Sequence, residues 1–198
     1  MRRILTVLAA VALVACGGGG DHELVGLTRD PPPQVDGVEL PDIAAGGAPF
    51  AFRAPADGLL VVYFGYTNCP DVCPTTMADL KLALEDVGDD AERVEVAMVT
   101  VDPARDTPVL AAYIQSFFPG AHAIATDDQS ALQSVAGPFG VSYEVRTAPD
   151  GEIQVGHSSN LFAVDDAGRL VLTWSVGGGE GTARADDLAG DIRQLLEA

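Results

Sequence analysis

The sequence predicts an α/β fold in which a central mixed sheet is flanked by helices. Two observations lead to this expectation. Apolar, β-rich runs alternate with segments of helical spacing along most of the chain, and near the end two such runs flank a short turn before a last helical segment. The chain has 198 residues, which is enough for one domain and a tail but too few for two well-buried cores.

The first half of the chain contains two strand–helix units. The run GLLVVYFGY at 58–66 is continuously apolar, as expected of a strand covered on both faces. The segment PTTMADLKLALEDVG at 74–88 follows with apolar residues at helical spacing, proline in its first turn and glycine at its end. A strand at 93–102 and a helix from about 108 to 118 repeat the order, so neighbouring strands should be parallel.

The second half predicts shorter elements and a hairpin. HAIAT predicts a short strand, DQSALQSVA a short helix stopped by Gly137 and Pro138, and VSYEVRT another extended piece. SNLFAVD and RLVLTWS flank the turn DAG and form a hairpin, and a last helix covers roughly 182–196. This order is that of a thioredoxin-like sandwich with an N-terminal extension and an insertion before the hairpin.

Composition excludes one class of partner. Eleven basic residues against 29 acidic ones leave a formal net charge of −18, which repels a phosphate backbone, so we expect no nucleic-acid binding. Hydrophobic residues make up 47% of the chain and charged residues 20%, as in a globular protein rather than a disordered one.

The N-terminus predicts the compartment. A positive MRR precedes the apolar run ILTVLAAVALVA, and LVAC resembles the lipobox of bacterial lipoproteins. We expect residues 1–16 to be a signal peptide whose Cys16 becomes the lipid anchor, 17–34 to be a flexible tether, and 35–198 to be the thioredoxin-like domain. An ordinary secretory signal or an uncleaved anchor helix is the alternative. If the chain is a lipoprotein, the domain is expected at the extracytoplasmic face of the bacterial cytoplasmic membrane.

The loop GYTNCPDVCP at 65–74 contains Cys69 and Cys73. Four positions apart at a helix N-terminus, their sulfurs can lie on one side, and the helix dipole favours the thiolate there. Such a pair suits either a disulfide or a shared metal ion, and both uses need the thiolate. The pair alone therefore leaves the alternatives open.

A histidine would favour a metal. Two thiolates with one imidazole suit both Cu(I) and Cu(II). Of the three histidines, we expect surface roles for His22, in the tether, and His122, beside a strand start. His157 is expected in a loop before a strand, and in a thioredoxin-like fold that loop faces the cysteines. By spacing alone, a core or surface role is the preferred interpretation of His157.

Three segments resemble the Sco (SenC) family: FGYTNCPDVCPTTMADL, VTVDPARDTP and GHSSNLFAVDDAGRL. Members of this family are membrane-tethered, thioredoxin-like copper proteins that help to assemble cytochrome c oxidase. The resemblance covers about residues 35–197. It implies copper as the bound metal, Cys69, Cys73 and His157 as its ligands, and the oxidase subunit with the binuclear copper site as the partner.

The resemblance also implies that Asp71, Asp102 and Asp106 lie near the site. Ordinary local roles explain these aspartates too, because Asp106 with Thr107 before a proline makes a good helix cap and Asp71 can shape the loop. One position departs from the family pattern. Many members have Asp directly before the histidine, where this chain has Gly156, which puts the fine tuning of affinity in doubt more than ligation.

The first functional hypothesis is a metallochaperone that passes copper on by ligand exchange, which requires no enzymatic turnover. The second is a thiol–disulfide oxidoreductase that reduces the copper-site cysteines of the oxidase, and the two roles can coexist. Thioredoxin-like reductants typically use C-x-x-C and a cis-proline where this chain has His157, its nearest preceding proline being Pro149, and this favours metal. A peroxidase and a purely structural disulfide rank lower, since the cysteines are paired and their loop is small.

Overall fold

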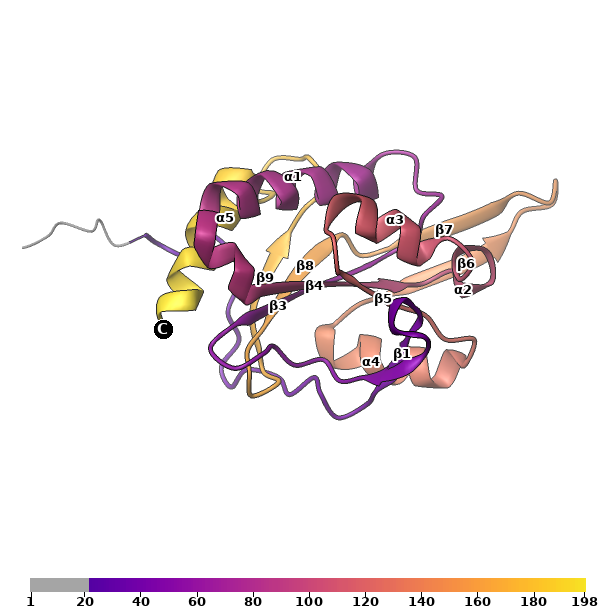
Figure 1. Cartoon of the computed structure of the whole chain (residues 1–198). Helices are drawn as coiled ribbons and strands as arrows, with labels where there is room; N and C mark the ends of the chain where they lie inside the picture. The colour runs from indigo at the N-terminus through magenta and orange to yellow at the C-terminus, as the bar shows by residue number, and fades with distance from the viewer. Residues whose placement is uncertain (1–21) are drawn as a thin grey trace, which may run out of the picture.

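The computed structural model describes residues 22–198 (Figure 1). The expected signal peptide, its Cys16 and the first residues of the expected tether lie outside the described residues. From residue 22 onward, the chain forms a seven-stranded sheet with helices on both faces and a separate two-stranded sheet.

The main sheet is mixed, as predicted. Strands β3 (Leu59–Gly65), β4 (Val94–Thr100) and β5 (His122–Ile124) are parallel, and β8 (Asn160–Val164) and β9 (Leu170–Ser175) form the predicted antiparallel hairpin beside β3. The strand order is β2-β1-β5-β4-β3-β8-β9, which puts β3 and β4 in the interior of the sheet. A strand in this position has its backbone hydrogen-bonded on both sides, which fixes its end firmly.

A short N-terminal hairpin completes the other edge of the sheet. Its strands are β1 (Leu40–Asp42) and β2 (Ala48–Phe50), joined through the 3-10 turn η1 (Ile43–Ala45), and β1 lies antiparallel to β5. A second 3-10 segment, η2 (Gly88–Arg93), connects the first helix to β4.

Helices cover β3 from both faces (Figure 1). Helices α1 (Val72–Val87), α3 (Leu110–Phe117) and α5 (Ala185–Glu197) lie on one face, and α4 (Gln129–Phe139) lies on the other. Every residue of β3 is buried, as the apolar run predicted. Alternate side chains enter opposite clusters: Leu59, Val61 and Tyr63 face α1, α3 and α5, whereas Leu60, Val62 and Phe64 face α4.

Two helix boundaries differ from the sequence prediction. A short helix, α2 (Pro103–Asp106), precedes α3, which begins only at Leu110. Helix α4 runs through Gly137 and Pro138, the residues predicted to stop it, and ends before Gly140. Gly140 has a φ of 76°, and its amide donates to the carbonyls of the last turn, so the left-handed glycine ends the helix. A proline this close to the end removes only one intrahelical bond.

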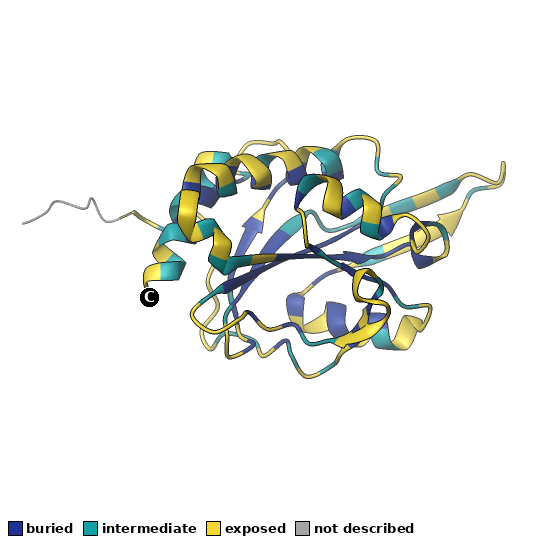
Figure 2. Cartoon of the chain, in the orientation of Figure 1, coloured by how far each residue is buried: buried dark blue, intermediate teal, exposed yellow. Residues whose placement is uncertain are grey.

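The predicted insertion is a second hairpin. Its strands are β6 (Tyr143–Thr147) and β7 (Ile153–His157), and they pair only with each other. The hairpin extends beyond the body of the domain (Figure 1), and its outer part is largely exposed (Figure 2). Strand β7 was not predicted. His157 is therefore the last residue of a strand, paired with Tyr143, and not part of a loop.

Residues from 22 to 34, within the expected tether, contact the domain. Leu27 pairs with Thr173 of β9. The fully buried Asp191 carboxylate accepts hydrogen bonds from the amides of Val25 (3.0 Å) and Gly26 (2.9 Å) and from Trp174 Nε1 (2.7 Å).

His22 contacts the same carboxylate, with its Nε2 2.6 Å from Asp191, so its role includes holding this segment on α5. Glycine is needed at position 26, since a Cβ there would lie 2.5 Å from the Leu172 side chain. None of the helices between residues 22 and 198 combines the length and apolar character that a bilayer crossing requires.

We expect Asp191→Ala to lower the free energy of unfolding by about 2–4 kcal/mol, because it leaves the buried Trp174 N–H and two amides without their acceptor. Chemical denaturation followed by the fluorescence of Trp174, the one tryptophan of the chain, measures this. Asp186→Ala, an exposed first-turn change on the same helix, should cost less than about 1 kcal/mol. Equal losses in both variants would contradict the anchoring role of Asp191.

Candidate metal centre

The two cysteines occupy different environments at the end of β3. Cys69 lies in the loop and is partly exposed, whereas Cys73 lies in the first turn of α1 and is fully buried. Both thiols are free. Cys69 Sγ accepts a hydrogen bond from the Cys73 amide at 3.3 Å, so the helix N-terminus holds this sulfur, as the spacing predicted.

His157 approaches the cysteines from the β6–β7 hairpin. Its Nε2 lies 3.7 Å from Cys73 Sγ. Its Nδ1 lies 2.9 Å from the carbonyl oxygen of Ser158, to which it donates, and this assigns the hydrogen to Nδ1. The lone pair on Nε2 is therefore free on the side of the sulfur, the arrangement expected of a metal-binding imidazole.

The surroundings of His157 favour its neutral imidazole form. Burial lowers the pKa of His157, and the hydrogen bond to Ser158 opposes this only in part. His157 is consequently uncharged at neutral pH and does not have to lose a proton before it binds a cation.

The pKa values of the two thiols are shifted in opposite directions. Burial raises the pKa of Cys73 to about 12, although hydrogen bonds from Tyr63 and the Tyr66 backbone oppose the shift. Burial also acts to raise the pKa of Cys69, but hydrogen bonds from the Cys73 amide and side chain outweigh it, so this pKa is lowered. The accessible sulfur is thus the readily ionised one.

The donor set fits a soft metal ion. Metal–sulfur and metal–nitrogen bonds of about 2.3 and 2.0 Å let two ligands of one ion lie up to roughly 4.3 Å apart. The separation of 3.7 Å between Cys73 Sγ and His157 Nε2 is within this limit. Among residues 22–198, no three His, Cys, Asp or Glu side chains are arranged as a complete metal site.

Two tyrosines that the sequence reasoning did not single out surround the imidazole. The rings of Tyr63 and Tyr66 stand edge-on to His157, with centroids at 6.0 and 5.8 Å. The Tyr63 hydroxyl donates to Cys73 Sγ at 3.4 Å. Gly65 makes room for this group, since a Cβ there would lie 2.5 Å from the Tyr63 ring and 3.3 Å from Cys73 Sγ. In the sequence, only the position of Tyr63 and Tyr66 at the end of the strand that leads into the cysteine loop could have indicated this role.

Asp106 supports the cysteine loop. Its fully buried carboxylate accepts hydrogen bonds from the Thr67 amide (2.9 Å), the Thr67 hydroxyl (2.6 Å) and the Thr100 hydroxyl (2.6 Å). The alternative role as a cap of the following helix is wrong, because Val109 occupies the N-cap position of α3 and the Thr107 hydroxyl donates to Pro103. The carboxylate instead joins the loop to the end of β4.

The other candidate residues have different surroundings. Asp102, the N-cap residue of α2, forms an ion pair with Arg105. Asp71 occupies the N-cap position of α1, but its side chain makes no capping hydrogen bond. His122 lies at the start of β5, the opposite end of the parallel strands from the cysteine loop, where its Nδ1 is 2.8 Å from the buried Asp42 carboxylate.

The fold and this site define a thioredoxin-like protein with a thiol–imidazole centre. The SCO1/SenC family pattern matches residues 43–197, and the chain therefore belongs to the SCO1/SenC family. A SCO2-like protein of Rickettsia prowazekii is 35% identical over 117 residues, which are 57% of this chain. The match spans only 56% of the length of that relative.

Solved structures show the same fold. The solution structure of apo Sco1 from Thermus thermophilus is 34% identical, with a TM-score of 0.74 over 89% of this chain and 99% of the other. Bradyrhizobium japonicum ScoI with copper bound is 26% identical, with a TM-score of 0.64 over 80% of this chain and 96% of the other.

We expect a thiol-alkylating reagent to modify Cys69 at pH 7 at least about tenfold faster than Cys73 in the reduced, metal-free protein. Cys69 is accessible and its pKa is lowered, whereas Cys73 is buried with a pKa of about 12. Mass spectrometry of peptides from timed iodoacetamide reactions measures both rates. Equal rates for the two thiols in the folded protein would contradict this preference. In urea, where the protein is unfolded, the two rates should be equal, and this is the control.

Asp106→Ala should lower the free energy of unfolding by about 2–4 kcal/mol, because it removes the shared acceptor of the Thr67 amide and of two hydroxyls. It should also increase hydrogen exchange at Thr67. The matched change Asp71→Ala, whose side chain makes no capping bond, should leave both properties nearly unchanged. Similar exchange in the two variants would show that Asp106 does not hold the loop.

Proposed function

We propose that this chain is a copper metallochaperone in which Cys69, Cys73 and His157 bind Cu(I) or Cu(II). The contact between Cys73 Sγ and His157 Nε2 carries this proposal, because it joins a thiol and a correctly protonated imidazole from segments 84 positions apart. Copper binding by ScoI of Bradyrhizobium japonicum supports the same cargo. Soft thiolates with one imidazole are ligands that both copper oxidation states accept.

Loading requires Cys73 to lose its proton, since the thiolate is the ligand. Its raised pKa opposes this loss in the empty site, and the charge of the bound ion reverses the preference. Cys69 lies in the loop and ionises more readily, so it is suited to meet the ion first. On delivery, ligands of the acceptor replace these three side chains one at a time, without turnover of a covalent substrate.

The acceptor we propose is the cytochrome c oxidase subunit that carries the binuclear copper site. In this proposal Cys16 is lipidated and holds the domain at the extracytoplasmic face of the bacterial cytoplasmic membrane. The family membership of the chain and the LVAC motif support this placement.

A thiol–disulfide oxidoreductase is the second candidate, and the opposite pKa shifts of the cysteines favour it. The Cys69 thiolate would attack a disulfide of the partner, and the displaced sulfur would take a proton. Cys73 would then lose its proton and attack Cys69, forming an internal disulfide and releasing the second partner thiol. Two electrons pass to the partner, as reduction of the copper-site cysteines in the oxidase would require.

We expect the reduced fragment 22–198 to bind one copper ion and Cu(II) to produce a thiolate charge-transfer band. His157→Ala should weaken the band and reduce copper affinity by at least about tenfold, because loss of a group that only orients a metal ligand already has an effect of this size. Titration followed by absorption spectroscopy measures both. His122→Ala, at the other end of the sheet, is the matched control and should behave as the parent. An unchanged spectrum for His157→Ala would remove that residue from the site.

The two candidate functions separate in cells. A strain lacking the gene should lose oxidase activity under copper limitation, and added copper should restore it if the protein supplies metal. If the protein delivers copper, the His157→Ala variant should fail to complement, because copper binding needs the imidazole whereas thiol exchange needs the cysteines alone. Full complementation by His157→Ala with failure of Cys69→Ser would instead assign thiol–disulfide exchange.

A further inference from the structure

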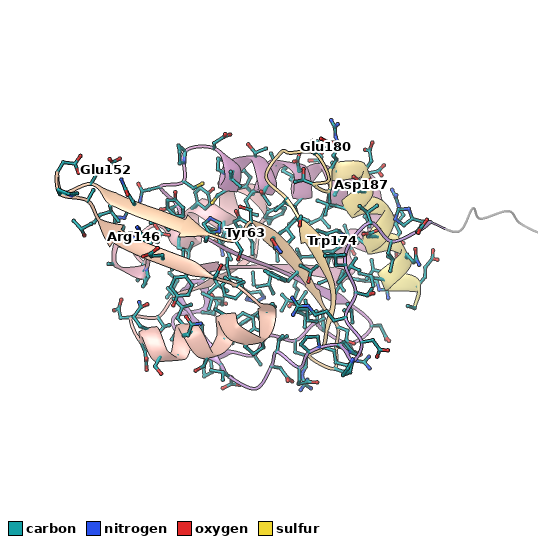
Figure 3. All side chains as sticks on the ribbon, turned by 180° about the vertical axis from the view of Figure 1, so that it is seen from behind. Tyr63, Arg146, Glu152, Trp174, Glu180 and Asp187 are labelled. Atoms are coloured by element: carbon teal, nitrogen blue, oxygen red, sulfur yellow. The ribbon has the colours of Figure 1, made fainter. Side chains whose placement is uncertain are left out.

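The β6–β7 hairpin leads directly from the candidate metal centre to the outside of the molecule. It pairs with no strand of the main sheet, and it projects from the end of the domain opposite to the N-terminal segment (Figure 1). In Figure 3 the labelled Glu152 lies at the far tip of the hairpin and Arg146 lies along β6. A two-stranded sheet has little stability of its own in water, so a hairpin this exposed gains from a partner.

The two faces of the hairpin differ in chemistry. Because side chains alternate along a strand, the pairs Val145↔Val155 and Tyr143↔His157 place apolar groups and the imidazole on one face. The opposite face is polar: Glu144, Arg146, Gln154 and Gly156.

The apolar face continues outward from the core. Tyr143 and Val155 pack against the cluster around α4, whereas Val145, farther along the hairpin, is 43% exposed and Ile153 is partly exposed. The exposed valine and the partly exposed isoleucine extend this face beyond the core, where a partner can contact them.

Charge indicates the kind of partner. From Tyr143 to His157 the hairpin has three acidic residues, Glu144, Asp150 and Glu152, and one basic residue, Arg146. Glu144 pairs with Arg146, which leaves the acidic groups near the tip to face an approaching molecule. The net charge of −18 on the chain adds to this field, so a basic surface is attracted.

We infer that the apolar face of the hairpin, Val145 with Ile153 and Val155, forms the docking surface for the copper-accepting protein. The partner places an apolar side chain on Val145, basic residues against Asp150 and Glu152, and its own copper ligands near His157, which belongs to the same face. This inference rests on the proposed metallochaperone function. Docking on the hairpin brings the incoming ligands to the exposed side of the site.

The test compares Val145→Glu with Gln154→Glu, which adds the same charge to the opposite face of the hairpin. Both variants should bind Cu(I) as the parent does, measured by competition with a chromogenic chelator. In stopped-flow transfer to the soluble domain of the oxidase subunit with the binuclear copper site, Val145→Glu should be slower by at least about fivefold, the effect of losing a central apolar contact. Gln154→Glu should stay within about twofold of the parent.

A second pair of measurements isolates docking from ligand exchange. Transfer to the small chelator needs no docked protein, so parent and Val145→Glu should release copper to it at equal rates. The double change Asp150→Lys, Glu152→Lys should slow transfer to the oxidase domain and reduce its dependence on salt.

Equal transfer rates for the parent and Val145→Glu would overturn the docking surface while the metallochaperone function remained. Failure of the parent to bind copper would overturn the proposed function itself. If sedimentation showed that the parent is a dimer and Val145→Glu a monomer, the face would bind a second copy of the chain. If the parent bound anionic lipid vesicles and Val145→Glu did not, the face would bind a membrane. Either result would also overturn the inference.

Discussion

The burial of β3 on both faces is the constraint on which the site depends. Helices pack against this strand from opposite sides of the sheet, and β4 and β8 form backbone hydrogen bonds with its two edges. Its end at Gly65 is therefore a fixed point from which the cysteine loop starts. Because α1 begins within a few residues and packs on the same core, Cys73 is buried in the first turn of the helix, while the partly exposed Cys69 lies in the loop.

Buried polar contacts set the remaining geometry. Asp106 satisfies the Thr67 amide and hydroxyl, and Ser158 decides which nitrogen of His157 is available. Each of these groups would be costly to leave unpaired, so each resists displacement. The result is one dry, fixed side of the centre around Cys73 and one accessible side around Cys69.

His157 connects the site to the most exposed part of the fold. It is the last residue of β7, and the hairpin that carries it is a separate two-stranded sheet. The imidazole is thus attached to a separate hairpin, whereas the two cysteines belong to the loop and the first turn of α1 beside the core.

The sequence by itself determined β3, α1, β4, the terminal hairpin and the cysteine pair at a helix start, because continuous apolar runs, helical spacing and turn residues act over a few positions. Only the tertiary structure decided that Asp106 supports the loop rather than capping a helix, that α4 continues past Gly137, that His157 ends a strand, and that the chain near His22 binds Asp191. The roles of Asp106, His157 and His22 depend on partners distant in the chain, whose proximity is created by burial of the core and leaves no local pattern. The end of α4 depends on the left-handed backbone of Gly140, which its sequence neighbours alone did not indicate.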